Sequence, residues 1–516
     1  MIKRLFTLTA TLLISVLASA QQFNYLHSGL DSTADYVHNI LLRTDGTFFL
    51  AGNSWQPVSD NQNPADAMWM NVSSNGANVL SVKHLHRHQM GLYMDYSGGV
   101  KQLPNIGYIM PYTANLCLFP YPYPGRYYTW AGLIALNFQM DTIFYKTYTD
   151  TAQHRENVYD CGVLPDGSIL MAGWQSSSYI SSSTVFDGML IGLAPNGNMN
   201  WKHTYQRPGY YCELHSIQPL DATRSLISGT LTDTAATNGY FKAYPWFLLI
   251  NNDGTLIRDT FFSNGYHYRA PAYSDMNGGY FFGAMTDSLL TSTVSDNQNF
   301  PPCLTHLDTN FNTDWQTLFP YGSNIFPDYI YKARQLMNGD YLVCGAGVRS
   351  GVQDVHLGWA ARVDPAGNIL WSKYYDTDNW KHGWLSDMVE RADSTLVFCG
   401  TAWNDTISMH QSYQAWILAT DADGNILDQT TFVPNKHSGD ISFQFYPNPA
   451  ASSFTIKTPG KGVAELFDMS GKRLASWSIS GNTTQIDLPP STAPGNYFLQ
   501  FTGLSGLAAG KLLTVK

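Results

Sequence analysis

Short apolar segments separated by Gly, Asn and Asp make up most of this chain. One recurring pattern is a turn followed by an apolar stretch that ends in Gly, as in residues 45–52 (DGTFFLAG), 166–173 (DGSILMAG) and 338–345 (NGDYLVCG). A second pattern is an apolar stretch, a turn and another stretch, as in residues 189–201 (MLIGLAPNGNMNW) and 359–371 (WAARVDPAGNILW). Both patterns are typical of β-strands joined by tight turns.

Together the two patterns define seven repeats. They begin near Tyr36, Met94, Val158, Cys212, Ala270, Tyr331 and Trp384, and successive starts lie 53 to 64 residues apart. Each repeat contains about four strands, and seven such units predict a seven-bladed β-propeller in which each blade packs against its neighbours. The segment 23–27 (FNYLH) resembles the last strand of a repeat. Two closures therefore stay open: this segment pairs with the final blade, or the ring closes without it.

Six repeats end their apolar strand in Gly. These residues are Gly52, Gly173, Gly229, Gly283, Gly345 and Gly400. Gly at a repeated strand end indicates a bulge or a close backbone approach, and we expect a side chain there to collide with the adjacent blade. Gly197 lies in a hairpin turn that we expect to face solvent, so Ala should cost roughly 1 kcal/mol there unless the position needs a positive φ.

Composition and charge agree with an exported all-β protein. The aromatic fraction is 14%, and 43 Gly and 32 Tyr favour strands and turns. The net charge of −10 gives no attraction to phosphate backbones, so nucleic acid is not expected as a partner.

The N-terminus has the features of a signal peptide. Residues 1–20 combine Lys3 and Arg4, an apolar stretch over 5–17 and the sequence Ala18-Ser19-Ala20, which predicts cleavage before Gln21. The alternative is a membrane anchor, but the stretch is shorter than the ~20 residues that a spanning helix needs. No transmembrane segment is expected elsewhere.

A different pattern follows residues 433–439 (VPNKHSG). Alternating apolar positions in 453–457, 464–474 and 495–501 predict a compact immunoglobulin-like β-sandwich of six or seven strands. The predicted division is a signal peptide over 1–20, the propeller over 21–437 and the sandwich over 441–516.

The C-terminal residues resemble the type A sorting domain of the type IX secretion system, which is found in Bacteroidota. The YPNP opening, the Asp-x-x-Gly-Lys hairpin, the Gly-x-Tyr strand and a final basic residue occur in the family's order. The matching residues are Tyr446, Pro447, Asn448, Pro449, Asp468, Gly471, Lys472, Gly495, Tyr497 and Lys516. The resemblance implies interaction with the type IX machinery, passage through the outer membrane, and either release or attachment to the cell surface.

One repeated position carries the candidate ligand-binding residues. Polar side chains recur thirteen residues before the Gly of their repeats, on the first strand. They are Asn39, Asp160, Ser216, Lys332 and Asp387. Because the first strands of propeller blades line the central channel, we predict that these side chains face either water or a ligand there.

Two other groups have both a structural and a functional interpretation. His84, His86 and His88 alternate as metal ligands on one strand face would, but they fall on the outer strand of the first repeat. The segment 421–425 (DADGN) resembles the start of a calcium loop, but other repeats have hairpin turns at this place. We favour the structural interpretation for both, so no metal or cofactor is expected.

Aromatic and thiol side chains also recur. Trp201, Trp315 and Trp371 either stack on sugar rings or pack between blades, and their shared repeat position favours packing. The six cysteines lack a C-x-x-C pair, so free buried thiols and a single disulfide both remain open.

The sequence contains no G-x-S-x-G, H-E-x-x-H or phosphate-binding glycine motif. The leading hypothesis is therefore an extracellular or surface-attached protein that binds a protein or glycan without catalysis. The alternative is a secreted carbohydrate-active or other hydrolytic enzyme with dispersed carboxylates at the channel.

Overall fold

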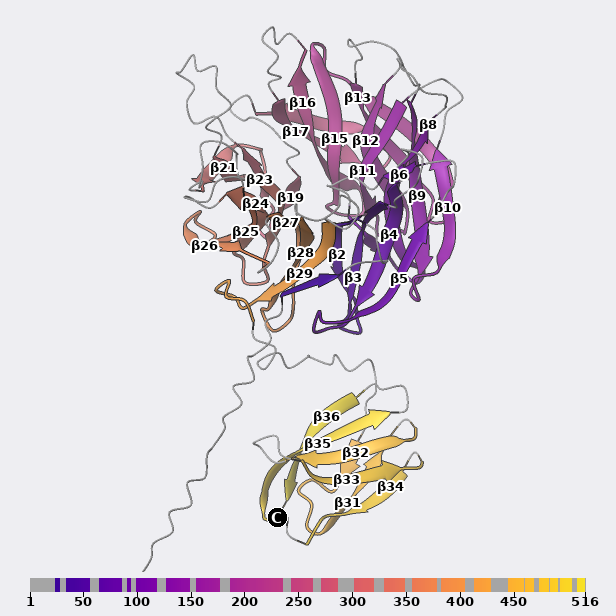
Figure 1. Cartoon of the computed structure of the whole chain (residues 1–516), viewed down its shortest axis with the longest axis vertical. Helices are drawn as coiled ribbons and strands as arrows, with labels where there is room; N and C mark the ends of the chain where they lie inside the picture. The colour runs from indigo at the N-terminus through magenta and orange to yellow at the C-terminus, as the bar shows by residue number, and fades with distance from the viewer. Residues whose placement is uncertain are drawn as a thin grey trace, which may run out of the picture.

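The described residues of the chain form β-strands and no helix (Figure 1). The computed structural model describes residues 24–27, 34–55, 65–85, 91–93, 99–117, 127–148, 155–176, 186–234, 243–262, 271–285, 301–319, 329–348, 355–377, 382–403, 413–427, 444–458, 460–467, 473–481, 483–490, 492–503 and 508–515. The predicted all-β class is confirmed. Within these ranges no helix is long and apolar enough to span a membrane. The predicted signal peptide over 1–20 lies outside them.

Among the described residues before 428, seven antiparallel sheets follow one another. The first contains β2 (Ala34–Leu42), β3 (Phe48–Trp55), β4 (Ala65–Val72) and β5 (Val79–Leu85). The second contains β6 (Gly91–Tyr93), β7 (Lys101–Leu103), β8 (Gly107–Cys117), β9 (Tyr127–Asn137) and β10 (Thr142–Tyr148). The third contains β11 (Arg155–Val163), β12 (Ile169–Ser176), β13 (Phe186–Leu193) and β14 (Met199–Tyr205).

The other four sheets have four strands each. The fourth contains β15 (Tyr210–Pro219), β16 (Arg224–Asp233), β17 (Ala243–Asn251) and β18 (Leu256–Phe261). The fifth contains β19 (Ala272–Ser274), β20 (Tyr280–Met285), β21 (Pro302–Leu307) and β22 (Thr313–Leu318). The sixth contains β23 (Tyr329–Gln335), β24 (Tyr341–Val348), β25 (His356–Val363) and β26 (Ile369–Tyr375). The seventh contains β27 (His382–Glu390), β28 (Leu396–Trp403), β29 (Tyr413–Thr420) and β1 (Asn24–His27).

The sheets form a propeller-like ring. The first strands contact one another in chain order, from β11 through β15, β19, β23 and β27 to β2. Figure 1 shows the sheets around a common centre, and we call the region where these first strands meet the ring centre. Apolar clusters join neighbouring sheets, as where Ile191 of the third sheet packs with Leu133 of the second.

The ring closes through the N-terminal strand. Strand β1 pairs antiparallel with β29, with Tyr25 opposite Ile417, and the Trp416 Nε1 donates to Asn24 Oδ1 at 2.6 Å. The last sheet also contacts the first, since the backbone N–H of Val37 donates to Thr401 Oγ1 at 3.1 Å. Of the two closures left open by the sequence, pairing of 23–27 with the final repeat is confirmed for residues 24–27.

The second sheet departs from the four-strand expectation. Its first strand is split, because β6 and β7 both pair with β8. Tyr93 lies opposite Thr113 and Lys101 opposite Ile109, so eight steps along one strand match four steps along its partner. The register offset between β6 and β7 is therefore four residues, whereas the first strands of five other sheets have a smaller irregularity.

That irregularity is a one-residue β-bulge, and it explains the repeated Gly. In the third sheet the register shifts between Val158 and Asp160, and Val158 lies opposite Gly173. A Cβ at Gly173 would lie 1.8 Å from the carbonyl oxygen of Asn157. Gly52, Gly229, Gly345 and Gly400 face the same position of their own first strands. The expected collision with the adjacent blade is therefore wrong for these five, because a carbonyl of the sheet's own first strand, two residues before the extra residue of the bulge, occupies the space. It holds for Gly283, whose Cβ would lie 2.5 Å from Ile330 Cγ2 of the next sheet.

Outer strands cover the hairpin turns of the next sheet. The Tyr148 hydroxyl donates to the carbonyl of Gly197 at 2.9 Å, and Tyr205 and Tyr375 repeat this contact with Gly254 and Gly424. Gly197 has φ +76°, and a Cβ there would lie 2.6 Å from the Phe144 ring. The expectation that Gly197 faces solvent is wrong, because the neighbouring sheet packs on its turn.

Residues 444–515 form a separate two-sheet unit. One sheet contains β31 (Ser453–Lys457) between β30 (Gln444–Tyr446) and β34 (Thr483–Asp487). The other has the order β33 (Arg473–Ile479), β32 (Gly462–Phe467), β35 (Gly495–Gly503) and β36 (Ala508–Val515). Buried side chains of both sheets, including Phe454 and Leu466, share one apolar core.

Candidate ligand site at the ring centre

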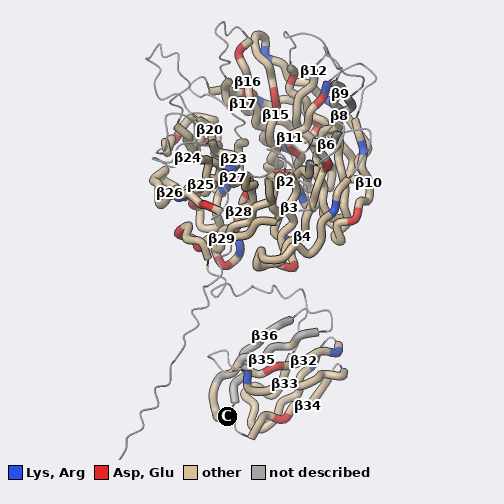
Figure 2. The backbone as a smooth tube through the Cα atoms, viewed as in Figure 1, with Lys and Arg blue, Asp and Glu red and all other residues tan. Residues whose placement is uncertain are grey.

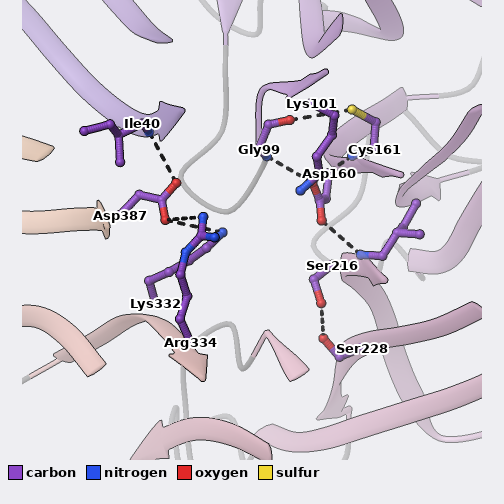
Figure 3. Close-up of polar contacts among 11 residues, drawn as sticks. Ile40, Gly99, Lys101, Asp160, Cys161, Ser216, Ser228, Lys332, Arg334 and Asp387 are labelled. Carbon is purple, nitrogen blue, oxygen red and sulfur yellow. Dashed lines mark hydrogen bonds and ion pairs between the residues drawn. The ribbon is translucent and has the colours of Figure 1, made fainter. Parts of the chain in front are cut away.

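All five predicted binding residues lie directly after the bulges of their first strands. Asn39, Asp160, Ser216, Lys332 and Asp387 follow the extra residue on β2, β11, β15, β23 and β27. Each is buried, with at most 7% of its surface exposed. Figure 3 shows four of them, with Lys332 beside Asp387 on one side of the ring centre and Ser216 near Asp160 on the other.

The first group is built around Asp387. Its Oδ1 accepts the backbone N–H of Met388 at 2.8 Å and a guanidinium N–H of Arg334 at 3.3 Å. The Lys332 Nζ lies 3.9 Å from the same oxygen. Oδ2 accepts the backbone N–H of Ile40, on the next first strand, at 3.3 Å. The carboxylate therefore joins β23, β27 and β2 at the seam where the ring closes.

The second group repeats this design around Asp160. Its Oδ1 accepts the N–H of Cys161 at 2.8 Å and that of Gly99 at 3.0 Å, and the Lys101 Nζ lies 3.4 Å away. Its Oδ2 accepts the N–H of Ile217, on the next first strand, at 3.0 Å. Both Asp residues thus satisfy the N–H of the following residue and one on the neighbouring strand. A carboxylate does this well because its two oxygens accept several hydrogen bonds at once.

The charges at Asp387 reinforce one another. Burial alone would raise the pKa of Asp387, but Lys332 and Arg334, with the N–H groups of Met388 and Ile40, hold it below its ordinary value. Burial alone would lower the pKa of Lys332, but the Asp387 carboxylate raises it above its ordinary value. All three side chains are charged at neutral pH, and the group carries two positive charges for one negative.

Ser216 and Asn39 differ in their partners. The Ser216 hydroxyl lies 2.5 Å from the Ser228 hydroxyl, which accepts the N–H of Ala272 on the next first strand at 2.9 Å. The buried Oδ1 of Asn39 has no hydrogen-bond partner among the described residues. The same holds for the Oγ of Ser386, the extra residue of the β27 bulge. Two unpaired polar atoms therefore lie on the adjacent strands β2 and β27.

The bulge residues themselves were not predicted from the sequence. They lie fourteen residues before the Gly of each sheet and are His38, Tyr159, His215, Tyr331 and Ser386. Neighbouring members contact each other, since the Tyr159 and His215 rings lie 4.7 Å apart. The constant spacing was readable in the sequence, but a regular strand would have placed these residues on the opposite face.

Four partly exposed aromatic residues gather at the same seam, and we call them the seam aromatics. They are Tyr36, Trp384, Trp403 and Tyr413. Ring centroids lie 4.5 Å apart for Tyr36 and Tyr413 and 5.6 Å apart for Trp403 and Tyr413, which are nearly parallel. The buried Nε1 of Trp384 has no partner among the described residues. Large aromatic surface and an unused donor therefore occur together on strands β2, β27, β28 and β29.

The favoured packing of the repeated tryptophans is confirmed. A Cβ on Gly254, Gly367 or Gly424 would lie about 3 Å from the ring of Trp201, Trp315 or Trp371, respectively, each in the preceding sheet. These rings therefore cover the hairpin turns of neighbouring sheets.

The Asp421 segment forms the predicted hairpin turn. Asp421 Oδ1 accepts the N–H groups of Asp423 and Asn425, and Gly424 has φ +75°. Of the alternating histidines, His84 lies on the outer strand β5, whereas His86 and His88 lie outside the described residues. The described residues contain no group of three potential metal ligands.

Five cysteines are free and buried: Cys161, Cys212, Cys303, Cys344 and Cys399. Burial raises the pKa of Cys212 to about 11 and that of Cys303 to about 12. These thiols are protonated at neutral pH, which makes them poor nucleophiles.

Several predicted sorting residues lie on described strands. Tyr446 ends β30 and is 53% exposed, and the bonds Tyr446–Pro447 and Asn448–Pro449 are cis. Gly495 and Tyr497 lie on β35, where the Tyr497 hydroxyl donates to the carbonyl of Ala493 at 2.6 Å. Asp468, Gly471, Lys472 and Lys516 lie outside the described residues.

Comparison with protein families identifies the C-terminal unit. Residues 444–515 match the model of the secretion system C-terminal sorting domain. The match supports a cargo of the type IX secretion system, and hence a secreted or cell-surface protein. No curated protein matches the chain.

Two solved structures are distantly similar to this chain. A protein of unknown function from Dyadobacter fermentans matches with 9% identity and a TM-score of 0.43, covering 66% of this chain and 96% of its own. Hydrazine synthase from Kuenenia stuttgartiensis matches with 11% identity and a TM-score of 0.45, covering 77% of this chain and 98% of its own. Such low values carry no argument about function.

Proposed function

We propose that the chain is a type IX secretion cargo whose body, residues 21–437, is a seven-bladed β-propeller that binds an extracellular protein or glycan without catalysis. The signal peptide over 1–20 directs export across the inner membrane. The unit over 441–516 is an immunoglobulin-like sorting domain that binds the type IX machinery through the residues from Tyr446 to Lys516 named above.

The part of this proposal that excludes catalysis rests on one observation. The carboxylates of the two predicted binding residues Asp160 and Asp387 are engaged by backbone N–H groups and by cations. A general acid needs a carboxyl whose pKa is raised toward the working pH. The pKa of Asp387 is instead lowered, so this group serves as a fixed negative charge.

The binding part of the proposal is supported by the same region. Asn39 and Ser386 present buried polar atoms without described partners, and the seam aromatics add partly exposed apolar surface nearby. A few placed polar groups beside aromatic surface are the usual composition of a binding site. We expect the ligand to bind beside Asn39, Lys332 and Asp387, with Asp160 and Ser216 on the facing side.

The test is a glycan array together with a hydrolase and lyase panel, both on the full chain. We expect binding to a defined ligand and no turnover. Turnover that a single change, Asp160→Asn or Asp387→Asn, abolishes while the protein remains folded would replace the binding function by the hydrolytic alternative.

A further inference from the structure

The ring centre holds more positive than negative charge on its β23 and β27 side. Lys332 and Arg334 both pair with Asp387, whereas on the facing side Lys101 alone pairs with Asp160. One net positive charge therefore remains at the Asp387 group (Figure 3). The chain as a whole has a formal charge of −10, and Figure 2 shows its charged residues sparsely distributed. This local excess is opposite in sign to the whole protein.

The two cations also have unused hydrogen-bond donors. A guanidinium has five N–H donors and an ammonium has three. The buried Nε of Arg334 has no partner among the described residues. The Lys332 Nζ lies 3.9 Å from Asp387, which is longer than a hydrogen bond, and 5.7 Å from the centre of the Tyr273 ring. Asp387 therefore forms a hydrogen bond with Arg334 at 3.3 Å but not with Lys332, and its oxygens also accept the N–H groups of Met388 and Ile40.

Solvent reaches this group. The side chain of Arg334 is 41% exposed, although its Nε is buried. Lys332 is 7% exposed and is fixed beside it on the same strand. A ligand can thus approach Arg334 while the charge of Lys332 acts from a partly desolvated position, where electrostatic attraction is screened less than at the surface.

We propose that Lys332 and Arg334 bind the anionic group of an acidic glycan, either a uronate carboxylate or a sulfate ester. Both groups present oxygens that accept N–H donors from a guanidinium and an ammonium. This inference rests on the proposed function, since it assigns a ligand class to the same ring centre.

The neighbouring side chains favour a sugar as the carrier of that group. Trp384 lies three residues before Asp387 on β27, with the bulge residue Ser386 between them. Its ring and that of Tyr36 lie 6.4 Å apart, and both are partly exposed. A sugar ring presents apolar C–H faces to such aromatics and hydroxyls to the unpaired polar atoms of Asn39 and Ser386. The negative charge of the whole chain disfavours long, highly charged polyanions.

The experiment is calorimetric titration of the full chain with four probes at matched length. They are an oligogalacturonate, a sulfated galactan oligosaccharide, a neutral galactan oligosaccharide and hexaglutamate. We expect one of the two acidic oligosaccharides to bind at least about tenfold more tightly than the neutral one, since a charge-assisted contact of 1.4 kcal/mol corresponds to that factor. The acidic probe that binds identifies the anion.

Variants locate the site. Arg334→Gln and Lys332→Met should each weaken acidic-glycan binding by about tenfold or more. Asp387→Asn should strengthen it, because the competing negative charge is removed while both cations stay. Arg207→Gln is the matched control, since Arg207 pairs with Asp259 on β18, far along the chain from this group, and should leave binding unchanged. Circular dichroism melts of each variant establish that it is folded. If Lys332→Met does not fold, Lys332→Arg takes its place. Because this variant keeps the positive charge, it should retain binding.

The outcomes separate the two proposals. Equal binding of acidic and neutral oligosaccharides, or acidic binding that Arg334→Gln does not weaken, overturns this inference and leaves glycan binding intact. Binding of hexaglutamate alone overturns the glycan and favours an acidic peptide. Absence of any ligand on the glycan array and of any protein partner would instead overturn the proposed function.

Discussion

At the scale of single residues, the glycines opposite the bulges are the most constrained positions of the body. A Cβ on Gly173 would lie 1.8 Å from a backbone oxygen of β11, and backbone cannot rotate away as a side chain can. Gly173→Val should therefore lower the free energy of unfolding by at least about 2 kcal/mol through strain and overpacking. Differential scanning calorimetry of the full chain measures the shift of the body's transition.

Gly209→Ala is the matched control in place of Gly197. Gly209 has φ +85° but no atom within 4 Å of a Cβ, so it carries only the cost of a left-handed backbone, about 1–2 kcal/mol. Gly197 is unsuitable because Phe144 lies against it. If Gly173→Val costs no more than Gly209→Ala, the close approach to the bulge does not determine this Gly.

The contribution of Asp387 to the stability of the folded chain depends on pH. Its pKa is lowered in the folded state, so its contribution to stability is fully present above the unfolded pKa of about 3.9 and is lost as pH falls through the folded pKa. We expect Asp387→Asn to lower the free energy of unfolding most at pH 7. The difference in this free energy between the variant and the wild type should shrink below about pH 4. Urea unfolding at pH 7, 4 and 3 measures this difference. A penalty that is the same at all three values contradicts an ionised, paired Asp387.

At the scale of elements, β1 is the part on which ring closure depends. Leu26 lies opposite Trp416 on β29 and packs against the apolar cluster between the sixth and seventh sheets. Leu26→Asp places a charge in this contact and exposes the edge of β29, so we expect a lower melting temperature of the body in a single transition.

Leu80→Asp is the control for the closure strand. Leu80 is also on a last strand, β5, but it is 54% exposed, so its replacement should change stability by no more than about 0.5 kcal/mol. Equal effects of the two changes would mean that β1 does not hold the ring.

Local patterns made most of the elements predictable. Asp-Gly and Asn-Gly turns marked the hairpins, and the structure places Gly167, Gly197 and Gly339 there with positive φ. The position thirteen residues before each Gly indicated the first strands correctly because the bulge has the same length in five sheets. The pattern did not predict the split first strand of the second sheet, where Tyr93 and Lys101 both pair with β8.

The candidate site was predictable only in part. The spacing in the sequence predicted Asp387 and Lys332 as binding residues. The contact of Asp387 with Ile40 was not predictable, because it joins residues 347 positions apart and exists only in a closed ring. Arg334 was missed because it lies two residues beyond the nominated position, on a strand whose partners a single repeat does not determine. Burial of the five polar residues also depends on neighbouring sheets, which a repeat viewed alone does not contain.

At the scale of the whole molecule, the body and the C-terminal unit have different roles. The repetitive body presents a ring centre with fixed charges, and the C-terminal unit matches a sorting domain used for secretion. The sorting unit has its own apolar core of residues such as Phe454, Leu466 and Phe501. Loss of that unit should therefore change where the body is delivered while leaving the contacts within the body in place.

The most direct measurement compares the location of the full chain with that of a chain truncated after Gly439, expressed in a bacterium with an active type IX system. We expect the full chain at the cell surface or in the medium. The truncated chain should cross the inner membrane and accumulate in the periplasm, since it lacks the residues from Tyr446 to Lys516, and it should remain folded when extracted. Cell fractionation and protease shaving of intact cells distinguish the two locations. Delivery of the truncated chain to the surface as efficiently as the full chain would contradict the type IX assignment.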